Sequence, residues 1–304
     1  MSAAARRGLP APWLIVIASL LFATMGVCVK LASQQYASGE IVLYRGLTGA
    51  TMMLLLSRWQ RGTLATRVPA MHFWRSLSGV TALCLWFYAI GGLPLATAMT
   101  LNYMSSVWMA LFLVGGVVML GGARVDGRLI ATALVGFAGV GLILRPTIEH
   151  DQLWHGLMGL LSGMVSATAY LQVTALGRAG EPEYRIVFYF SIAGITAGLL
   201  TTLFTGMHAH TPRGIALLLA VGLLATLAQL LMTRAYATGR TLVNASLQYM
   251  GIGWSFLFGV LWFDDSVTLL ALVGMALIIA AGIAAASLRR EVNPADPANS
   301  TLES

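Results

Sequence analysis

The sequence predicts an all-α integral membrane protein with ten transmembrane helices, arranged as two inverted five-helix repeats. Of its 304 residues, 58% are hydrophobic and only 10% are charged, whereas a typical soluble domain has roughly 25% charged residues. Apolar runs of about 20 residues, the length that crosses a bilayer, recur ten times along the chain. One motif of polar and aromatic residues also occurs twice, once in each half of the chain.

The apolar runs are expected to be helices. Lipid offers no hydrogen-bonding partner to backbone N–H and C=O groups, and these runs are about twice as long as the strands of a membrane barrel. The first run follows Arg6 and Arg7 as in a signal peptide, but nine further runs favour an uncleaved first span. The predicted spans are 12–31, 39–57, 73–92, 95–119, 129–145, 154–176, 185–206, 213–235, 241–263 and 267–288.

The arginines between the runs predict the orientation of the chain. If the N-terminus is cytoplasmic, fourteen arginines fall on the cytoplasmic side and only Arg145 and Arg213 on the other. Cytoplasmic loops of membrane proteins carry such an excess of basic residues. We therefore expect an inner-membrane protein with both termini in the cytoplasm. The formal charge of +7 is therefore interpreted as a topology signal, and no nucleic-acid partner is expected. The fourteen are Arg6, Arg7, Arg58, Arg61, Arg67, Arg75, Arg124, Arg128, Arg178, Arg185, Arg234, Arg240, Arg289 and Arg290.

An internal repeat relates the two halves. The motif Leu-Asn-Tyr-Met at 101–104, followed by Trp108, recurs as Leu-Gln-Tyr-Met at 247–250, followed by Trp254, always 146 residues later. Five predicted spans separate the copies, and because this number is odd the second copy crosses the membrane in the opposite sense. Inverted repeats let two similar halves expose a midplane site to either side in turn. The alternative is that duplication only builds a stable bundle.

These observations divide the chain into five parts. We expect a cytoplasmic N-terminus at 1–11, a first five-helix repeat at 12–145, a linker at 146–153, a second repeat at 154–290, and a disordered C-terminal tail at 291–304. The tail is polar and interrupted by proline, as disordered segments commonly are. Small residues in the fifth and tenth spans, among them Gly139 and Gly274, favour close helix packing and a scaffold role.

Several segments carry a resemblance to a known family. They are Tyr88-Ala89-Ile90, the run Leu-Pro-Leu-Ala-Thr-Ala at 93–98, Arg45, and the second-half run from Arg234-Ala235-Tyr236 through Trp254 to 277–279. With them the sequence resembles the drug/metabolite transporter superfamily in its EamA branch, and within it the YddG-type exporters of aromatic and other neutral amino acids. The resemblance implies a ten-span carrier of small polar metabolites, with neutral and aromatic amino acids as substrates.

Polar side chains at helical spacing predict where a central cavity lies, because such groups are costly in lipid unless they face protein or water. Amide and hydroxyl groups supply hydrogen bonds and aromatic rings supply flat walls for a substrate. The alternative interpretation is that the polar groups join helices and that the aromatic rings form interfacial belts. The predicted substrate-binding residues are Tyr88, Asn102, Tyr103, Ser105, Trp108, Ser166, Tyr170, Gln229, Asn244, Gln248, Tyr249, Trp254 and Ser255.

Two basic residues near one membrane surface are candidates to contact a substrate carboxylate. Lys30 ends the first span and Arg45 lies six residues into the second. A cation at this depth costs about 1–3 kcal/mol unless it reaches water or a partner. For Arg45 the alternatives are a pair with Glu40 or a bond to helix carbonyls, and for Lys30 the alternative is an extended side chain that reaches water.

No other chemistry is indicated by the sequence. No Asp or Glu lies deep within a predicted span, and the five histidines lie in or beside loops, so no carboxylate for proton coupling is expected. An enzyme would need a midplane cluster of His, Asp or Cys, and we expect neither catalysis nor a cofactor or metal. A drug, nucleotide or sugar carrier and a non-transporting scaffold remain alternatives, and a homodimer is left open.

Overall fold

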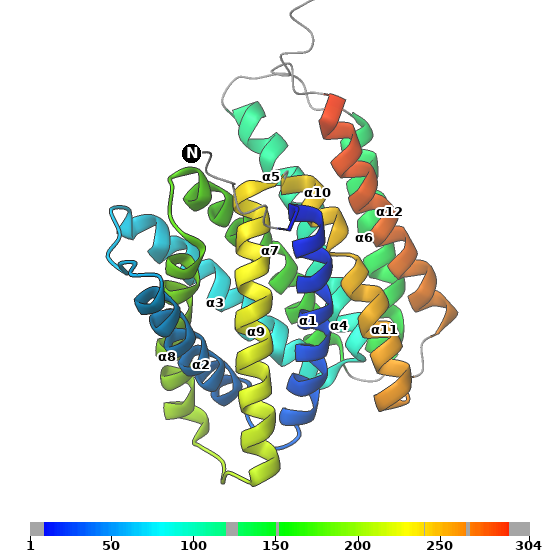
Figure 1. Ribbon diagram of the computed structural model, residues 1–304. Helices are drawn as coiled ribbons and strands as arrows, with labels where there is room; N and C mark the ends of the chain where they lie inside the picture. The colour runs from blue at the N-terminus through cyan, green and yellow to red at the C-terminus, as the bar shows by residue number, and fades with distance from the viewer. Residues whose placement is uncertain (1–8, 120–126, 150–151, 240, 266–267, 292–304) are drawn as a thin grey trace, which may run out of the picture.

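The structure, a computed structural model, describes residues 9–119, 127–149, 152–239, 241–265 and 268–291. Arg6, Arg7, Arg124, Arg240 and almost all of the predicted tail lie outside these residues. Within the described ranges every regular element is an α-helix (Figure 1). The helices are α1 (Ala11–Ala32), α2 (Ser38–Trp59), α3 (Pro69–Gly92), α4 (Leu95–Tyr103), α5 (Ser105–Met119), α6 (Gly127–Glu149), α7 (Leu153–Arg178), α8 (Glu183–Thr205), α9 (Pro212–Thr238), α10 (Thr241–Leu247), α11 (Met250–Phe263) and α12 (Leu269–Glu291).

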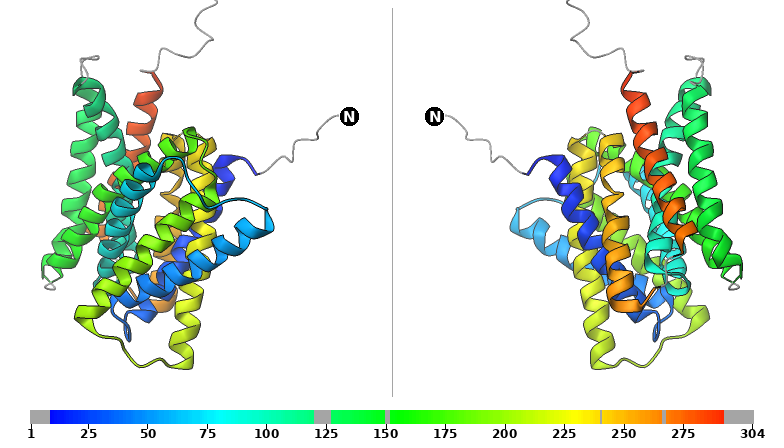
Figure 2. Two further views of the ribbon diagram at one scale, coloured as in Figure 1. Left: turned by 90° about the vertical axis from the view of Figure 1, so that its left-hand side faces the viewer. Right: turned by 90° about the vertical axis from the view of Figure 1, so that its right-hand side faces the viewer.

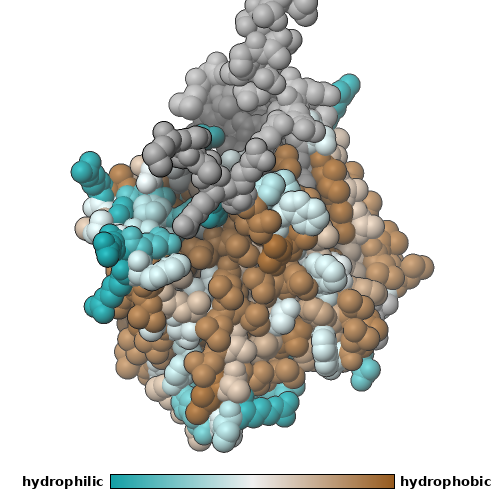
Figure 3. Space-filling view, in the orientation of Figure 1, coloured by the Kyte–Doolittle hydropathy of each residue, from teal (hydrophilic) through white to brown (hydrophobic). Residues whose placement is uncertain are grey.

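The outer surface is apolar where it would face lipid. By length and composition, α1, α7, α8 and α9 each contain an apolar stretch sufficient to cross a bilayer. On α9, Ile215, Leu219, Leu223 and Leu227 recur at every fourth position and are each about half exposed. Figure 3 shows hydrophobic residues over the middle of one face, with hydrophilic residues gathered toward its lower end and upper left edge. Such a surface is unfavourable in water and suits a membrane.

Two of the predicted spans are each broken into two helices. The span predicted at 95–119 consists of α4 and α5, which meet at Met104, and the span predicted at 241–263 consists of α10 and α11. The Met104 N–H approaches the carbonyls of both Thr100 and Leu101, at 3.2 and 3.3 Å, so the turn tightens locally. The hydropathy of these runs is continuous, and it therefore gave no sign of the breaks.

The two halves of the chain are interleaved. The most extensive helix contacts join α2 to α8, α3 to α7, α1 to α9 and α6 to α12, and each pair takes one helix from either half. Figures 1 and 2 show α6 and α12 together at one side of the molecule. A Cβ on Gly139 of α6 would lie 2.7 Å from the Gly274 carbonyl oxygen of α12. Small residues in both spans were predicted to allow close helix approach, and here they let these two helices approach each other.

The α2–α8 pair is held together along its length by close backbone contact. A Cβ added to Gly46 would lie 2.8 Å from the Ser191 carbonyl oxygen, and one added to Gly198 would lie 2.6 Å from the Leu43 backbone. Side chains other than hydrogen would therefore push the helices apart. This contact matters for function because α2 and α8 both contribute residues to the cavity described below.

A glutamate and a histidine meet at each end of the α2–α8 pair. At one end, buried Glu40 accepts hydrogen bonds from the backbone N–H of His208 at 2.7 Å and contacts the His208 ring at 2.6 Å. At the other end, Glu181 contacts the His72 ring at 2.9 Å. Glu40 is therefore not a partner of Arg45, which was one of the alternatives for that arginine.

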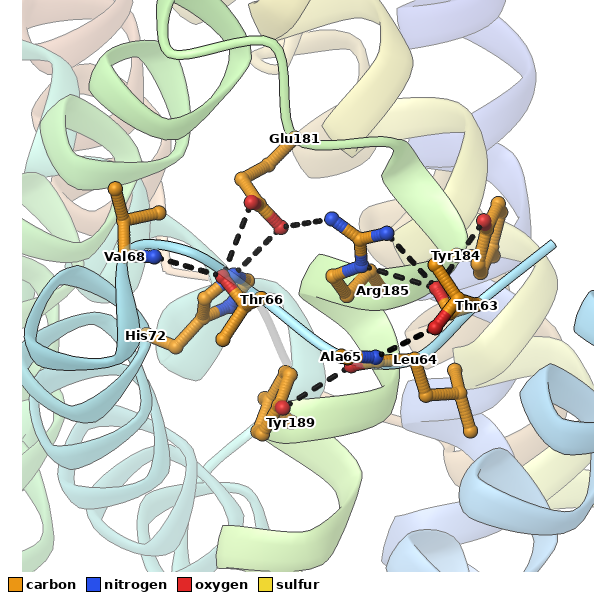
Figure 4. Close-up of polar contacts among 10 residues, drawn as sticks. All are labelled: Thr63, Leu64, Ala65, Thr66, Val68, His72, Glu181, Tyr184, Arg185 and Tyr189. Atoms are coloured by element: carbon orange, nitrogen blue, oxygen red, sulfur yellow. Dashed lines mark hydrogen bonds and ion pairs between the residues drawn. The ribbon is translucent and has the colours of Figure 1, made fainter.

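At the Glu181 end the hydrogen bonds form a wider network (Figure 4). Glu181 also accepts hydrogen bonds from Arg185 and Thr66, both at 3.0 Å, and Arg185 in turn donates to the Thr63 carbonyl. Burial alone would raise the pKa of the Glu181 carboxyl, but the bonds from His72, Arg185 and Thr66 outweigh it and lower this pKa below the ordinary value. The carboxylate thus anchors the segment after α2 to the segment before α8.

Candidate functional site

A buried cavity lies where α1, α2, α3, α4, α7, α8, α9 and the α10–α11 break meet. Its volume is about 50 Å³, enough for a few water molecules. It is lined by Phe22, Met25, Arg45, Arg75, Gly79, Ala82, Leu83, Trp86, Asn102, Tyr103, Ser166, Ala169, Tyr170, Phe190, Gln229, Met232 and Gln248. Both halves of the chain therefore contribute polar and apolar residues to one cavity.

The helix breaks place two amides of the internal repeat at this cavity. Asn102 and Tyr103 end α4, and Gln248 lies between α10 and α11. The Asn102 amide donates to Ser162 at 2.9 Å and to Ser166 at 3.3 Å, which fixes it against α7. Gly163 permits this contact, since a Cβ there would lie 2.6 Å from the Leu101 carbonyl oxygen.

Two amides and one indole leave polar atoms unpaired in the cavity wall. The Gln229 Nε2, the Gln248 Oε1 and the Trp86 Nε1 are buried and have no hydrogen-bond partner among the described residues. Leaving a buried polar group unpaired typically costs about 1–3 kcal/mol. Such groups beside a cavity are positioned to bind polar atoms of a substrate.

Two buried arginines flank one aromatic ring in the same cavity. Arg45 of α2 and Arg75 of α3 are only 4% and 2% exposed. Their guanidinium carbons lie 4.8 and 4.4 Å from the centre of the Phe190 ring of α8. Neither forms an ion pair with a described residue. The cavity wall is therefore strongly cationic.

Several predicted site residues are brought together at this cavity. Besides Arg45, they are Asn102, Tyr103, Ser166, Tyr170, Gln229 and Gln248. They come from α2, α4, α7, α9 and the α10–α11 break, so residues distant in sequence converge at one place.

The other predicted site residues lie elsewhere. The Asn244 amide donates to the Ala235 carbonyl and the Ser255 hydroxyl to the Gly251 carbonyl. Tyr88 is 39% exposed and stacks on His155, and Trp108 packs against Phe112 and Phe137. Ser105 and Tyr249 are buried and Trp254 is half-buried, and all three lie outside the cavity lining.

Lys30 has a protein partner. Its ammonium lies 2.8 Å from Asp265 Oδ1 and 4.5 Å from the centre of the Phe263 ring. Asp265 also accepts a hydrogen bond from the backbone N–H of Leu95, at the start of α4. Lys30 therefore joins α1 to the end of α11 in this structure, neither lining the cavity nor extending freely into water.

Arg75 and Phe190 line the cavity but were not among the site residues predicted from the sequence. Arg75 was counted among the cytoplasmic topology residues, but it is buried in the second turn of α3 and lines the cavity. Its position only a few residues inside an apolar run resembles that of a basic residue at a membrane surface, so its location in sequence did not reveal its burial. Phe190 was one apolar residue among many. Within the described residues no three His, Cys, Asp or Glu side chains group into a metal site.

Comparisons with known proteins place this arrangement in a family. A family model described as the EamA-like transporter family matches residues 9–145. The chain is 30% identical over 271 residues to the pseudopaline exporter CntI of Pseudomonas aeruginosa, covering 89% of this chain and 94% of the relative. It is 25% identical over 287 residues to a riboflavin transporter of Rhizobium johnstonii, covering 92% of this chain and 93% of the relative.

The fold agrees with that of a solved protein. One crystal structure aligns with 93% of this chain and 99% of its own at a TM-score of 0.65 and 17% identity, a likeness of fold alone. The curated relatives are named as transporters of chemically different molecules and not as exporters of amino acids. With apolar helices, a polar cavity and a relative 30% identical over nearly its whole length, the chain belongs to the EamA-like family of membrane transporters.

Proposed function

We propose that the protein moves small polar metabolites across the inner membrane, as an exporter or facilitator, by alternating access around the central cavity. One observation carries the proposal. Asn102 and Gln248 occupy equivalent positions of the internal repeat, each at a helix break, and both line the same buried cavity. Discontinuous helices that meet at the interface of two repeats are a common way for transporters to build a midplane site.

The proposal includes ten membrane spans in two inverted repeats, with α4–α5 and α10–α11 each forming one broken span. The helix contacts support it. A two-fold relation that exchanges the halves would exchange the α3–α7 contact with the α1–α9 contact and map α2–α8 and α6–α12 onto themselves. The arginine distribution in the sequence supports cytoplasmic termini on the same arrangement.

The substrate is proposed at the level of class. The sequence predicted neutral and aromatic amino acids, and Trp86 and Phe22 give the cavity aromatic walls that suit them. The relatives' names, pseudopaline exporter and riboflavin transporter, instead extend the candidates to larger polar metabolites. A drug or nucleotide carrier and a non-transporting scaffold are the alternatives that a transport assay distinguishes.

Transport in liposomes tests the proposal. We expect purified protein to move labelled members of a panel of amino acids, organic acids and flavins faster than protein-free vesicles do. Asn102→Ala and Gln248→Ala are each expected to slow uptake about three- to tenfold, the effect of one lost hydrogen bond of about 1 kcal/mol. Thr196→Ala is the control, because this hydroxyl is on an exposed face of α8 and bonds only to its own helix.

Two results would contradict the proposed transport or its site. Wild-type vesicles that move no member of the panel would contradict a carrier. If the Thr196 variant slowed uptake as much as the two amide variants, the cavity would not be the substrate site.

A further inference from the structure

Arg45 and Arg75 place two positive charges in the cavity, and no described carboxylate pairs with either of them. The described carboxylates that form ion pairs do so with other residues: Asp265 with Lys30, Glu181 with His72 and Arg185, Glu40 with His208, and Glu183 with Arg234. No Asp or Glu is among the described residues that line the cavity. Arginine remains protonated in proteins, so both charges persist.

Several nitrogens of the two arginines also lack hydrogen-bond partners. Arg45 Nε and Arg75 Nε and Nη1 are buried and unpaired among the described residues. Burying an ion without a partner costs several kcal/mol, whereas a desolvated cation over an aromatic ring gains on the order of 2 kcal/mol. The contacts of both arginines with Phe190 therefore do not by themselves offset their burial, and an anion in the cavity would supply the missing partner.

We propose that the cavity selects organic anions with two carboxylates, one facing Arg45 and the other facing Arg75. At about 50 Å³ the cavity holds only a few water molecules, so such an anion enters when the proposed transport cycle opens the cavity to one side. Planar guanidinium groups pair well with carboxylates through two parallel hydrogen bonds. Both guanidinium carbons lie within 4.8 Å of the centre of the Phe190 ring, so two cations stand close enough together for one anion to reach both. The inference rests on the proposed transport function and narrows its substrate class.

Charge balance distinguishes this class from neutral amino acids. A zwitterion adds no net charge. Its single carboxylate can face only one of the two arginines, and its ammonium group would enter a wall where no described residue is a carboxylate. A dicarboxylate neutralises both arginines. If it also carries an amino or hydroxyl group, the unpaired Gln248 Oε1 is available as an acceptor. From the sequence, Arg45 and Lys30 were the candidates to contact a substrate carboxylate. In this proposal Arg45 keeps that role and Arg75 takes the role of Lys30.

Equilibrium binding to the purified full-length protein tests the proposal. The probes are unbranched dicarboxylates from malonate to adipate, together with glutamate and citrate. Each probe is compared with its own amide or with leucine, a neutral amino acid. We expect at least one diacid to raise the thermal unfolding midpoint of the wild type, because a ligand of the folded state stabilises it, while its diamide has no effect.

Neutral variants supply the second measurement. Arg45→Gln and Arg75→Gln are each expected to weaken binding of that diacid on the order of 30-fold or more, as for truncation of a buried charge pair. Without ligand both variants should unfold at the same or a higher temperature than the wild type, because an uncompensated buried charge is removed. A merely structural arginine would give the opposite shift. Arg58→Gln is the matched control, an exposed arginine on the same helix as Arg45.

Two results would overturn the proposal: no diacid stabilises the wild type more than its diamide, or the variants bind the diacid as tightly as the wild type does. Either result can be distinguished from a failure of the proposed transport. Flux without any charge preference would keep the carrier and remove the anion site, whereas diacid binding without flux would keep the site and remove the carrier.

Discussion

Replacing Glu181 with alanine is expected to lower the free energy of unfolding by about 3–5 kcal/mol, the usual cost of removing one partner from a buried charged network. The carboxylate side chain is 6% exposed and bonds to His72, Arg185 and Thr66. Without it, the His72 ring loses its charged partner, and the segment after α2 loses its tie to α7 and α8. Thermal unfolding followed by tryptophan fluorescence in detergent measures the loss.

Glu183→Ala is the matched control for this variant. Glu183 lies two residues away, but it is one-third exposed and only 3.9 Å from a half-exposed Arg234, so its pair is worth about 1 kcal/mol at most. Equal destabilisation by the two variants would show that the Glu181 network contributes no more than a surface pair.

The contribution of Glu181 also depends on pH. Because the hydrogen bonds lower the pKa of this carboxyl in the folded state, its contribution is fully present above the ordinary carboxyl pKa of about 4.3. It is lost as the pH falls through the lowered value. The difference in unfolding midpoint between wild type and Glu181→Ala is therefore constant near neutrality and narrows in acid. A difference that widens in acid would contradict this.

Gly198→Leu is expected to destabilise the protein by about 3 kcal/mol and to abolish the anion site. Its first side-chain carbon would lie 2.6 Å from the backbone nitrogen and Cα of Leu43. Backbone cannot move aside as a flexible side chain can, so α2 and α8 must separate, and the cost exceeds the gain of about 1 kcal/mol from replacing a helical glycine. Separation would move Arg45 of α2 away from Phe190 of α8.

Gly141→Leu controls for the added side chain, since a Cβ at this exposed position of α6 meets nothing within 4 Å. We expect its unfolding temperature and its diacid binding to match those of the wild type. Unchanged binding in the Gly198 variant would mean that the α2–α8 contact does not position the cavity.

The sequence by itself determined the all-helical, apolar character of the fold and part of the site. Length and hydropathy of the runs are local properties, and they were sufficient to predict helices close to those observed. The motif that recurs 146 residues later also identified two cavity residues, Asn102 and Gln248, where hydropathy is uninformative.

Only the tertiary structure decided which polar groups face the cavity. Asn244 and Ser255 bond to backbone carbonyls, and Lys30 pairs with Asp265, so none of these lines it. Arg75, which resembled a surface arginine, lies beside Phe190 from a distant helix. The physical reason is that the cost of a buried polar group depends on its partners, and partners come from whichever helices pack together rather than from neighbours in the chain.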